Sequence, residues 1–102
     1  MPLRIALVGA RGRMGQAITA AAQALGHTIS APMDQGDDLA VGIKTADAVI
    51  DFSFHATTGE VIKHAATFKK PLVIGTTGHA AEEKKQLLVE AAKIPCVWSG
   101  NY

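Results

Sequence analysis

Seven residues near the start of the chain have the types and spacing of a phosphate-binding turn. Glycines stand three apart in the run Gly9-Ala10-Arg11-Gly12-Arg13-Met14-Gly15, directly after an apolar β-type run. A helix that begins here presents unpaired N–H groups and the positive end of its dipole, and both attract an anion. Glycines also let the backbone turn sharply and lie close to a ligand. The chemistry that these residues offer is the binding of a diphosphate.

The spacing of this turn leaves two interpretations open. It follows G-x-x-G-x-x-G and not the commoner G-x-G-x-x-G, so the turn either binds a nucleotide or only joins a strand to a helix. Arg11 and Arg13 stand inside it, where they either neutralise phosphate charge or are simply exposed. Arg13, beside the start of the helix, is the better candidate of the two.

Asp34 is the second candidate, at the place where dinucleotide-binding folds carry an acidic residue. It follows another β-type run, about 20 positions beyond the glycine turn, where a carboxylate can hold ribose hydroxyls. Such a carboxylate repels a 2′-phosphate unless a base intervenes. Gln35 follows, and no Arg or Lys precedes Lys44, so we expect NADH to be accepted at least as well as NADPH. The alternative is a solvated loop aspartate.

Small, hydroxyl and amide residues also follow the later predicted strands. Ligands of a doubly wound sheet lie across the carboxyl ends of its strands, so agreement among these turns favours a nucleotide site. The simpler alternatives are helix capping by Thr77 and core packing by the aromatic residues. His55 and His79 also lie at strand ends, where exposed turn histidines are the favoured interpretation. The turns are Phe52-Ser53-Phe54, Gly75-Thr76-Thr77 and Ser99-Gly100-Asn101-Tyr102.

These turns need strands and helices to position them, and the apolar periodicity predicts both. We expect Pro32 to end the second strand, residues 35–44 to be a loop with one helical turn near Leu39 as an alternative, and a capping box at Thr57–Glu60. Strands are predicted over residues 4–8, 27–31, 46–51, 72–74 and 94–98, and helices over residues 13–25, 57–70 and 80–93.

The alternation of apolar strands with helices predicts an α/β fold. We expect a doubly wound, Rossmann-like parallel sheet of about five strands with flanking helices, and residues 1–102 as one dinucleotide-binding domain. No helix follows the final predicted strand, so one face of the sheet should lack its last cover. The chain is therefore expected to be a piece of a longer protein, truncated before a substrate domain.

Composition narrows the function classes. The net charge of +1 argues against a nucleic-acid partner, and the single cysteine rules out an internal disulfide and a cysteine zinc cluster. The four histidines lack metal-ligand spacing, so no metal is expected. No signal peptide or membrane-spanning run is present, so we expect a cytoplasmic protein with no membrane partner.

Four motifs in this order resemble the dihydrodipicolinate reductase family, the 4-hydroxy-tetrahydrodipicolinate reductases of lysine and diaminopimelate biosynthesis. The resemblance covers the full chain, but only as the N-terminal, cofactor-binding part of that family. The motifs are Gly9-Ala10-Arg11-Gly12-Arg13-Met14-Gly15, Val49-Ile50-Asp51-Phe52-Ser53, Val73-Ile74-Gly75-Thr76-Thr77-Gly78 and Ser99-Gly100-Asn101-Tyr102.

The resemblance implies a role for each motif. Residues 9–14 would bind the diphosphate of NADH or NADPH, and Asp34 would hold the adenosine ribose. The nicotinamide side would be approached by Gly75, Thr76 and Thr77, and Phe52 and Ser53 would also contact the cofactor. The site would be closed by Ser99, Gly100, Asn101 and Tyr102.

The resemblance also implies what the longer protein would do. It would form a homotetramer and transfer a hydride to a cyclic imine dicarboxylate. No catalytic residue is assigned in this chain, because the family's His-rich motif and its P-S-G-T run are absent. We therefore expect the chain alone to bind NAD(P)H weakly or not at all and to turn nothing over.

Two alternatives stay open, and one departure affects the site. Phe54-His55 stand where the family usually carries a proline, so contacts from that loop are left unassigned. The chain could instead be a free-standing nucleotide-binding or redox-sensing module, which has no reason to keep the Gly75 turn and Asn101 together. It could also be the cofactor domain of another NAD(P)-dependent reductase.

Overall fold

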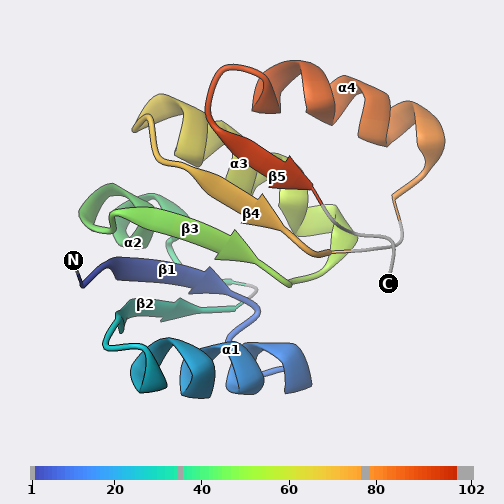
Figure 1. Ribbon diagram of the computed structural model, residues 1–102. Helices are drawn as coiled ribbons and strands as arrows, with labels where there is room; N and C mark the ends of the chain where they lie inside the picture. Colours follow the sequence, from blue (N-terminus) through green and yellow to red (C-terminus); the bar gives the residue numbers. More distant parts are fainter. Residues whose placement is uncertain (1, 35, 77–78, 99–102) are drawn as a thin grey trace.

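Five short parallel strands form one sheet in the computed structural model, which describes residues 2–34, 36–76 and 79–98 (Figure 1). Their order across the sheet is β2-β1-β3-β4-β5, and each neighbouring pair is parallel. The strands are β1 (Arg4–Val8), β2 (Thr28–Met33), β3 (Ala48–Asp51), β4 (Leu72–Ile74) and β5 (Cys96–Trp98).

Helices connect the strands and cover the sheet unequally. The chain steps from β1 outward to β2 and then back past β1 to β3, so right-handed crossovers place the helices on opposite faces. The first helix lies alone on one face, and the later helices lie on the other (Figure 1). The helices are α1 (Arg13–Ala24), α2 (Leu39–Thr45), α3 (Thr58–Thr67) and α4 (Ala81–Ala91), with a short 3₁₀ turn, η1 (His55–Thr57), before α3.

The core lies between the sheet and the helices on the more covered face. Val8 on β1, Ile43 on α2 and Ile62 on α3 are fully buried and belong to one apolar cluster. The central strands are apolar because a parallel sheet is enclosed by its crossover helices. The predicted doubly wound, Rossmann-like α/β fold is therefore confirmed.

Pro32 does not end the second strand, as the sequence predicted, but lies inside β2 opposite Leu7. Because β2 is the edge strand of the sheet, the missing N–H of proline can face outward without removing a ladder hydrogen bond. The extra two residues bring Met33 to the end of the strand, and its carbonyl oxygen then accepts hydrogen bonds from the N–H groups of Gly9 and Ala10.

The second half of the loop predicted over residues 35–44 is helical in the structure, where α2 begins at Leu39 as in the alternative prediction but runs longer than one turn. Asp38 caps this helix by accepting a hydrogen bond from the N–H of Val41 at 3.4 Å. Leu39 and Ile43 then lie four positions apart on one buried face. The prediction failed because Gly42 lowers helix propensity, although its position packs tightly against Met33 and Ala31 of β2.

The start of the next helix also differs from prediction. Thr57 has helical backbone angles and no side-chain capping hydrogen bond, so the capping box expected there does not form. The η1 turn leads into α3 instead, and Thr58 is buried as the first residue of that helix. The predicted strands at 46–51 and 94–98 are shorter in the structure, because β3 begins at Ala48 and β5 at Cys96.

One part of the sheet is uncovered, in agreement with the expectation of a missing last cover. Val73 on β4 and Val97 on β5 are 40% and 60% exposed. In the part of the chain that the structure describes, α1 is the one helix on that face, and it contacts β2 at the opposite edge of the sheet. Within the same residues, no helix is both long and apolar enough to span a membrane.

Candidate functional site

The glycine turn between β1 and α1 is fixed at both ends by close backbone contacts. Gly9 has a φ of +92°, and a Cβ at this position would overlap the carbonyl group of Phe52. Gly15 is buried in the first turn of α1, where a Cβ would overlap the carbonyl oxygen atoms of Gly9 and Ala10. The fold itself therefore requires glycine at the first and last positions of the motif.

Gly12, the middle glycine, is open on its outer side. The nearest atom to a Cβ built there is the carbonyl oxygen of Gly9, at 3.6 Å, which is an ordinary contact distance. Its φ of −70° is also accessible to any residue. Packing within the described chain does not require glycine here, and the empty space lies in front of the start of α1.

The N-terminus of α1 is uncapped and exposed. Gly12 is its N-cap and supplies no side-chain hydrogen bond, and no acidic residue stands in the first turn. The exposed residues Arg13 and Met14 follow. An uncapped helix start offers free N–H groups and a partial positive charge, so it can accept an anionic group.

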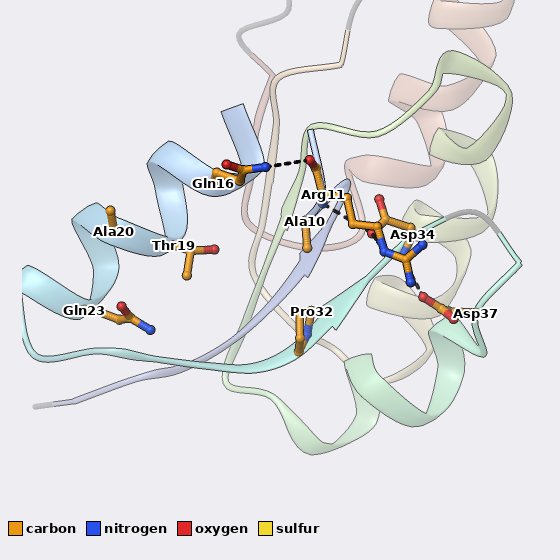
Figure 2. Close-up of a pocket in the computed structure, with 9 residues that line it drawn as sticks. All are labelled: Ala10, Arg11, Gln16, Thr19, Ala20, Gln23, Pro32, Asp34 and Asp37. Atoms are coloured by element: carbon orange, nitrogen blue, oxygen red, sulfur yellow. Dashed lines mark hydrogen bonds and ion pairs between the residues drawn. The ribbon is translucent and has the colours of Figure 1, made fainter. Parts of the chain in front are cut away.

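Asp34 lies at the end of β2, beside the glycine turn (Figure 2). Its Oδ2 atom accepts a hydrogen bond from the N–H of Arg11 at 3.3 Å and pairs with Nε of Arg11 at 3.6 Å. The N–H of Asp34 donates to Oδ2 of Asp37 at 2.8 Å. The carboxylate is thus held in place, while its side chain keeps 27% of its surface exposed.

Arg11 is the base beside Asp34 that sequence reasoning did not find. A base beside Asp34 was expected only among the residues that follow it, whereas the guanidinium group comes from the glycine turn, 23 residues earlier. The Arg11 side chain is 89% exposed, so the ion pair is solvated and can rearrange around a ligand. Arg11 and Asp34 were both recognised in the sequence, but their contact with each other was not.

A cavity of about 560 Å³ lies between α1 and the end of β2 (Figure 2). The side chains of Gln16, Thr19 and Gln23 line it from the helix, and Pro32, Asp34 and Asp37 line it from the other side. Gln16 is fixed by a hydrogen bond from its Nε2 to the carbonyl oxygen of Arg11 at 3.1 Å.

Asp51, at the end of β3, organises the turns that follow β3 and β4. Its fully buried Oδ1 atom accepts hydrogen bonds from the N–H of Ser53, at 3.0 Å, and from the Ser53 hydroxyl. Its backbone oxygen accepts from the N–H of Gly75 at 2.8 Å and the hydroxyl of Thr76 at 3.2 Å. Its Oδ2 atom finds no hydrogen-bond partner among the described residues. The sequence motif contained Asp51, but its role as an anchor was not predicted.

A cavity of about 710 Å³ opens between these turns and the start of α1. Gly75 lies directly against the ring of Phe52, so a Cβ there would force this ring to move. The residues that line this cavity are Gly12, Arg13, Met14, Phe52, Ser53, Gly75 and Thr76.

A third cavity of about 400 Å³ connects the two ends of the site. It shares Gly12, Phe52 and Ser53 with the 710 Å³ cavity, and Arg11 and Asp34 with the cavity beside α1. The three cavities therefore form one row along the carboxyl edge of the sheet. This row crosses β1 and β3, where the strand order reverses and ligands of such folds bind.

The structure brings most of the predicted site residues together along this row. The predicted residues that line at least one of these three cavities are Gly9, Ala10, Arg11, Gly12, Arg13, Met14, Asp34, Phe52, Ser53, Gly75 and Thr76. Thr77, Ser99, Gly100, Asn101 and Tyr102 were also predicted and lie outside the described residues.

The histidines and Cys96 lie outside these three cavities. His55 and His79 are half-buried and not exposed as expected, because they pack edge-on against each other with ring centroids 6.1 Å apart. Burial raises the pKa of the Cys96 thiol, so this thiol is a poor nucleophile. Over residues 2–34, 36–76 and 79–98, no three His, Cys, Asp or Glu side chains are grouped to hold a metal ion.

Comparison with known proteins gives a consistent family match. Residues 3–102 match the sequence model of a family described as dihydrodipicolinate reductase, N-terminus. The 4-hydroxy-tetrahydrodipicolinate reductase of Akkermansia muciniphila is 42% identical over 98% of this chain and 41% of its own length. The enzymes of that name from Alkalilimnicola ehrlichii and Caulobacter vibrioides are 35% and 36% identical, over 100% and 99% of this chain and 47% and 43% of their lengths. The chain spans less than half the length of these relatives.

Proposed function

Since the chain belongs to the dihydrodipicolinate reductase family and matches its N-terminal part, we propose that it is the domain that holds the nicotinamide cofactor. The observation that carries this proposal is the row of cavities that joins Asp34, the uncapped start of α1 and the Gly75 turn. A dinucleotide has two nucleosides joined by a diphosphate, and this row offers a carboxylate, an anion site and an open cavity in that order. The residues present therefore fit the cofactor.

Each part of the cofactor has a matching part of the site. The diphosphate would lie on the N–H groups at the start of α1, over the open face of Gly12. Asp34 would accept hydrogen bonds from the adenosine ribose, and the nicotinamide would enter the cavity that Phe52 and Gly75 line opposite the start of α1. As part of the same proposal, Thr77 would lie on the nicotinamide side, and Ser99, Gly100, Asn101 and Tyr102 would close the site.

Asp34 and Arg11 together support the use of both NADH and NADPH. Asp34 suits the free ribose hydroxyls of NADH, whereas the exposed guanidinium of Arg11 can pair with a 2′-phosphate when it turns from Asp34. The rearrangement costs little, because a solvated ion pair contributes at most about 1 kcal/mol.

The full reaction belongs to a longer protein in this proposal. When bound, the cofactor supplies the hydride, and the residues of this chain bind it, orient it and limit water around the nicotinamide. The acceptor would be a cyclic imine dicarboxylate of lysine and diaminopimelate biosynthesis, and the enzyme would be a cytoplasmic homotetramer. No residue of this chain is assigned a catalytic role.

The proposal is tested by titrating NADH into the chain while recording backbone amide NMR shifts. We expect weak, saturable binding that shifts the amides of Gly12, Arg13 and Gly75 and leaves α4 unchanged. Asp34→Asn should weaken binding about tenfold, because hydrogen bonds to a charged group are worth about 1.5–3 kcal/mol. Glu90→Gln on the surface of α4 is the matched control. Unchanged spectra at about 10 mM NADH, a concentration that detects even millimolar affinity, would contradict the proposal.

A further inference from the structure

His79 joins three segments at the carboxyl edge of the sheet, although it does not line the cavities of the site. A hydrogen bond of 2.8 Å joins its Nε2 atom to Oγ1 of Thr58. Its ring also lies edge-on to the ring of Trp98, with centroids 5.1 Å apart, a favourable aromatic geometry. Thr58 begins α3, His79 lies just before α4 and Trp98 ends β5. One side chain therefore connects the segments at the ends of β3, β4 and β5.

The hydroxyl that His79 contacts is buried. Thr58 has no exposed surface, and buried hydroxyl groups in folded proteins are nearly always hydrogen-bonded. The other side of the cluster is also constrained, because Nζ of Lys84 on α4 lies 5.2 Å from the centre of the Trp98 ring. His79 thus sits between a buried hydroxyl and the partly buried ring of Trp98.

The segments that begin α3 and precede α4 also carry two walls of the cavity proposed for the nicotinamide. Phe52 and Ser53 form one wall, in the segment that leads to Thr58, and Gly75 and Thr76 form a second wall beside it, in the segment that leads to His79; the start of α1 forms the third. The walls are already in close contact, because a Cβ on Gly75 would overlap the Phe52 ring. In such tight packing, a small shift of one segment against the other changes the shape of the cavity.

We propose that His79 is a positioning residue, which holds these two adjoining walls in the relative position that the nicotinamide requires. It acts through Thr58 and Trp98, without contacting the cofactor. The inference rests on the proposed function, since it assigns a determinant of affinity to the nicotinamide end of the same site.

The test compares two ligands on this chain, NADH and ADP-ribose, which lacks the nicotinamide. His79→Phe keeps an aromatic ring against Trp98 but removes the hydrogen bond, and Thr58→Val removes the hydroxyl with little change of shape. His79→Gln places an amide group where Nε2 was, and His64→Phe on α3 is the matched histidine control. Amide NMR titrations give both affinities, and urea unfolding gives the stability of each variant.

We expect His79→Phe and Thr58→Val each to weaken NADH about five- to tenfold, the effect of one lost hydrogen bond, and ADP-ribose less than about twofold. The double variant should lose no more NADH affinity than either single variant, because both remove the same interaction. It should nevertheless be more stable than His79→Phe, which leaves the Thr58 hydroxyl buried without its partner. His79→Gln should recover most of the NADH affinity, and His64→Phe should match the unmodified chain.

The outcomes separate this inference from the proposed function. If the unmodified chain binds neither ligand, the proposed function fails and the inference fails with it. If both ligands bind but His79→Phe weakens them equally, or weakens neither, the proposed function stands and the inference is overturned. The inference would also be overturned if the double variant regained both the stability and the NADH affinity that His79→Phe loses. The lower affinity of His79→Phe would then result only from its lower folding stability.

Discussion

The three glycines of the first turn serve different purposes. Gly9 and Gly15 sit where a side chain would overlap backbone atoms of the turn or of Phe52, so the fold needs them. Gly12 meets no such restriction, and its missing side chain leaves the start of α1 open. Within this one motif, Gly9 and Gly15 therefore serve the stability of the fold, and Gly12 serves binding.

Replacing Gly15 and Gly12 by alanine should separate these purposes. Gly15→Ala should lower the free energy of unfolding by about 1–3 kcal/mol, the usual cost of forcing a methyl group into a packed site. Gly12→Ala should cost less than about 1 kcal/mol, as expected for an N-cap position. Gly12→Ala should still weaken NADH about tenfold, because its methyl group would stand where the diphosphate must approach. Urea unfolding and NADH titration measure the two effects, and equal NADH affinity in Gly12→Ala and the unmodified chain would contradict this assignment.

Arg11 and Arg13 are close in sequence but face different parts of the site. Arg11 pairs with Asp34 at 3.6 Å, whereas Arg13 lines the cavity on the Gly75 side. Arg11→Ala should weaken NADPH about tenfold and NADH less than about threefold, because a 2′-phosphate would lose a charge-assisted partner. Arg13→Ala should weaken both cofactors alike through the shared diphosphate. Competition titrations measure the four affinities, and an equal loss of both cofactors in Arg11→Ala would refute the specificity role.

At the scale of the elements, helix packing decides whether a glycine can be replaced. Gly59 on α3 has open space, and an added Cβ would meet Leu87 Cδ2 at 3.5 Å, an ordinary contact. Gly42 on α2 lies against β2, where a Cβ would come within 2.9 Å of the Cβ of Ala31 and would overlap Met33. The same residue type thus has a propensity cost in one helix and a packing role in the other.

Alanine at these two positions should change stability in opposite directions. Gly59→Ala should raise the free energy of unfolding by about 0.5–1 kcal/mol, the difference in helix propensity between the two residues. Gly42→Ala should lower it by about 1–3 kcal/mol, because overlap with β2 outweighs the same gain in propensity. Urea unfolding measures both, and stabilisation by Gly42→Ala would show that α2 can move away from β2 at little cost.

The start of β1 is tied to the residue before β3 by an exposed ion pair. Arg4 donates to Asp47 from its backbone N–H at 2.8 Å and from its guanidinium at 3.2 Å and 3.4 Å. These hydrogen bonds, first from the side chain and then from the backbone, hold the pKa of Asp47 below its ordinary value. A carboxylate with a depressed pKa in the folded state stabilises that state above its unfolded pKa, and the contribution disappears as pH falls through the folded pKa.

Asp47→Asn should therefore be less stable than the unmodified chain at neutral pH, and the difference should shrink in acid. We expect the full difference above about pH 5 and its loss below about pH 4, given the ordinary aspartate pKa of about 3.9. Urea unfolding of both proteins across this range measures the difference. A difference that does not vary with pH would assign the effect to packing and not to the charge.

At the scale of the whole molecule, one edge of the sheet carries the proposed cofactor site, and one face of the sheet is only partly covered by helices. The carboxyl ends of β1, β2, β3 and β4 carry the site, while Val73 and Val97 remain exposed on the face that α1 shares. In our proposal, no residue of this chain is assigned the proton transfer that accompanies hydride transfer to the imine. Binding and catalysis are thus separated between this chain and the remainder of a longer protein in our proposal.

This chain alone should therefore not catalyse the reduction. With NADH and the cyclic imine dicarboxylate present, the absorbance of the reduced nicotinamide should stay constant within the rate of a protein-free control. The relative from Akkermansia muciniphila, named as the reductase, is the positive control. Substrate-dependent decay of the absorbance with this chain would show that its residues suffice for the chemistry.

Local patterns in the sequence were sufficient for the order of the elements and for most of the candidate site. The glycine turn, Asp34 and the Gly75 turn could be recognised because each depends on neighbouring residues and on a strand that ends just before it. Pro32 and α2 were misassigned because tertiary contacts overruled local propensity: β2 is an edge strand, and Gly42 packs against it.

The sequence by itself determined the fold class and family, through short-range apolar periodicity and four motifs in order. Only the tertiary structure brought the guanidinium of Arg11 to Asp34, used the buried Asp51 to hold two separate turns, and placed His79 on Thr58. The physical reason is that each of these contacts joins segments from different strand ends. Their distances depend on the parallel register of the sheet, and no local pattern in the chain encodes that register.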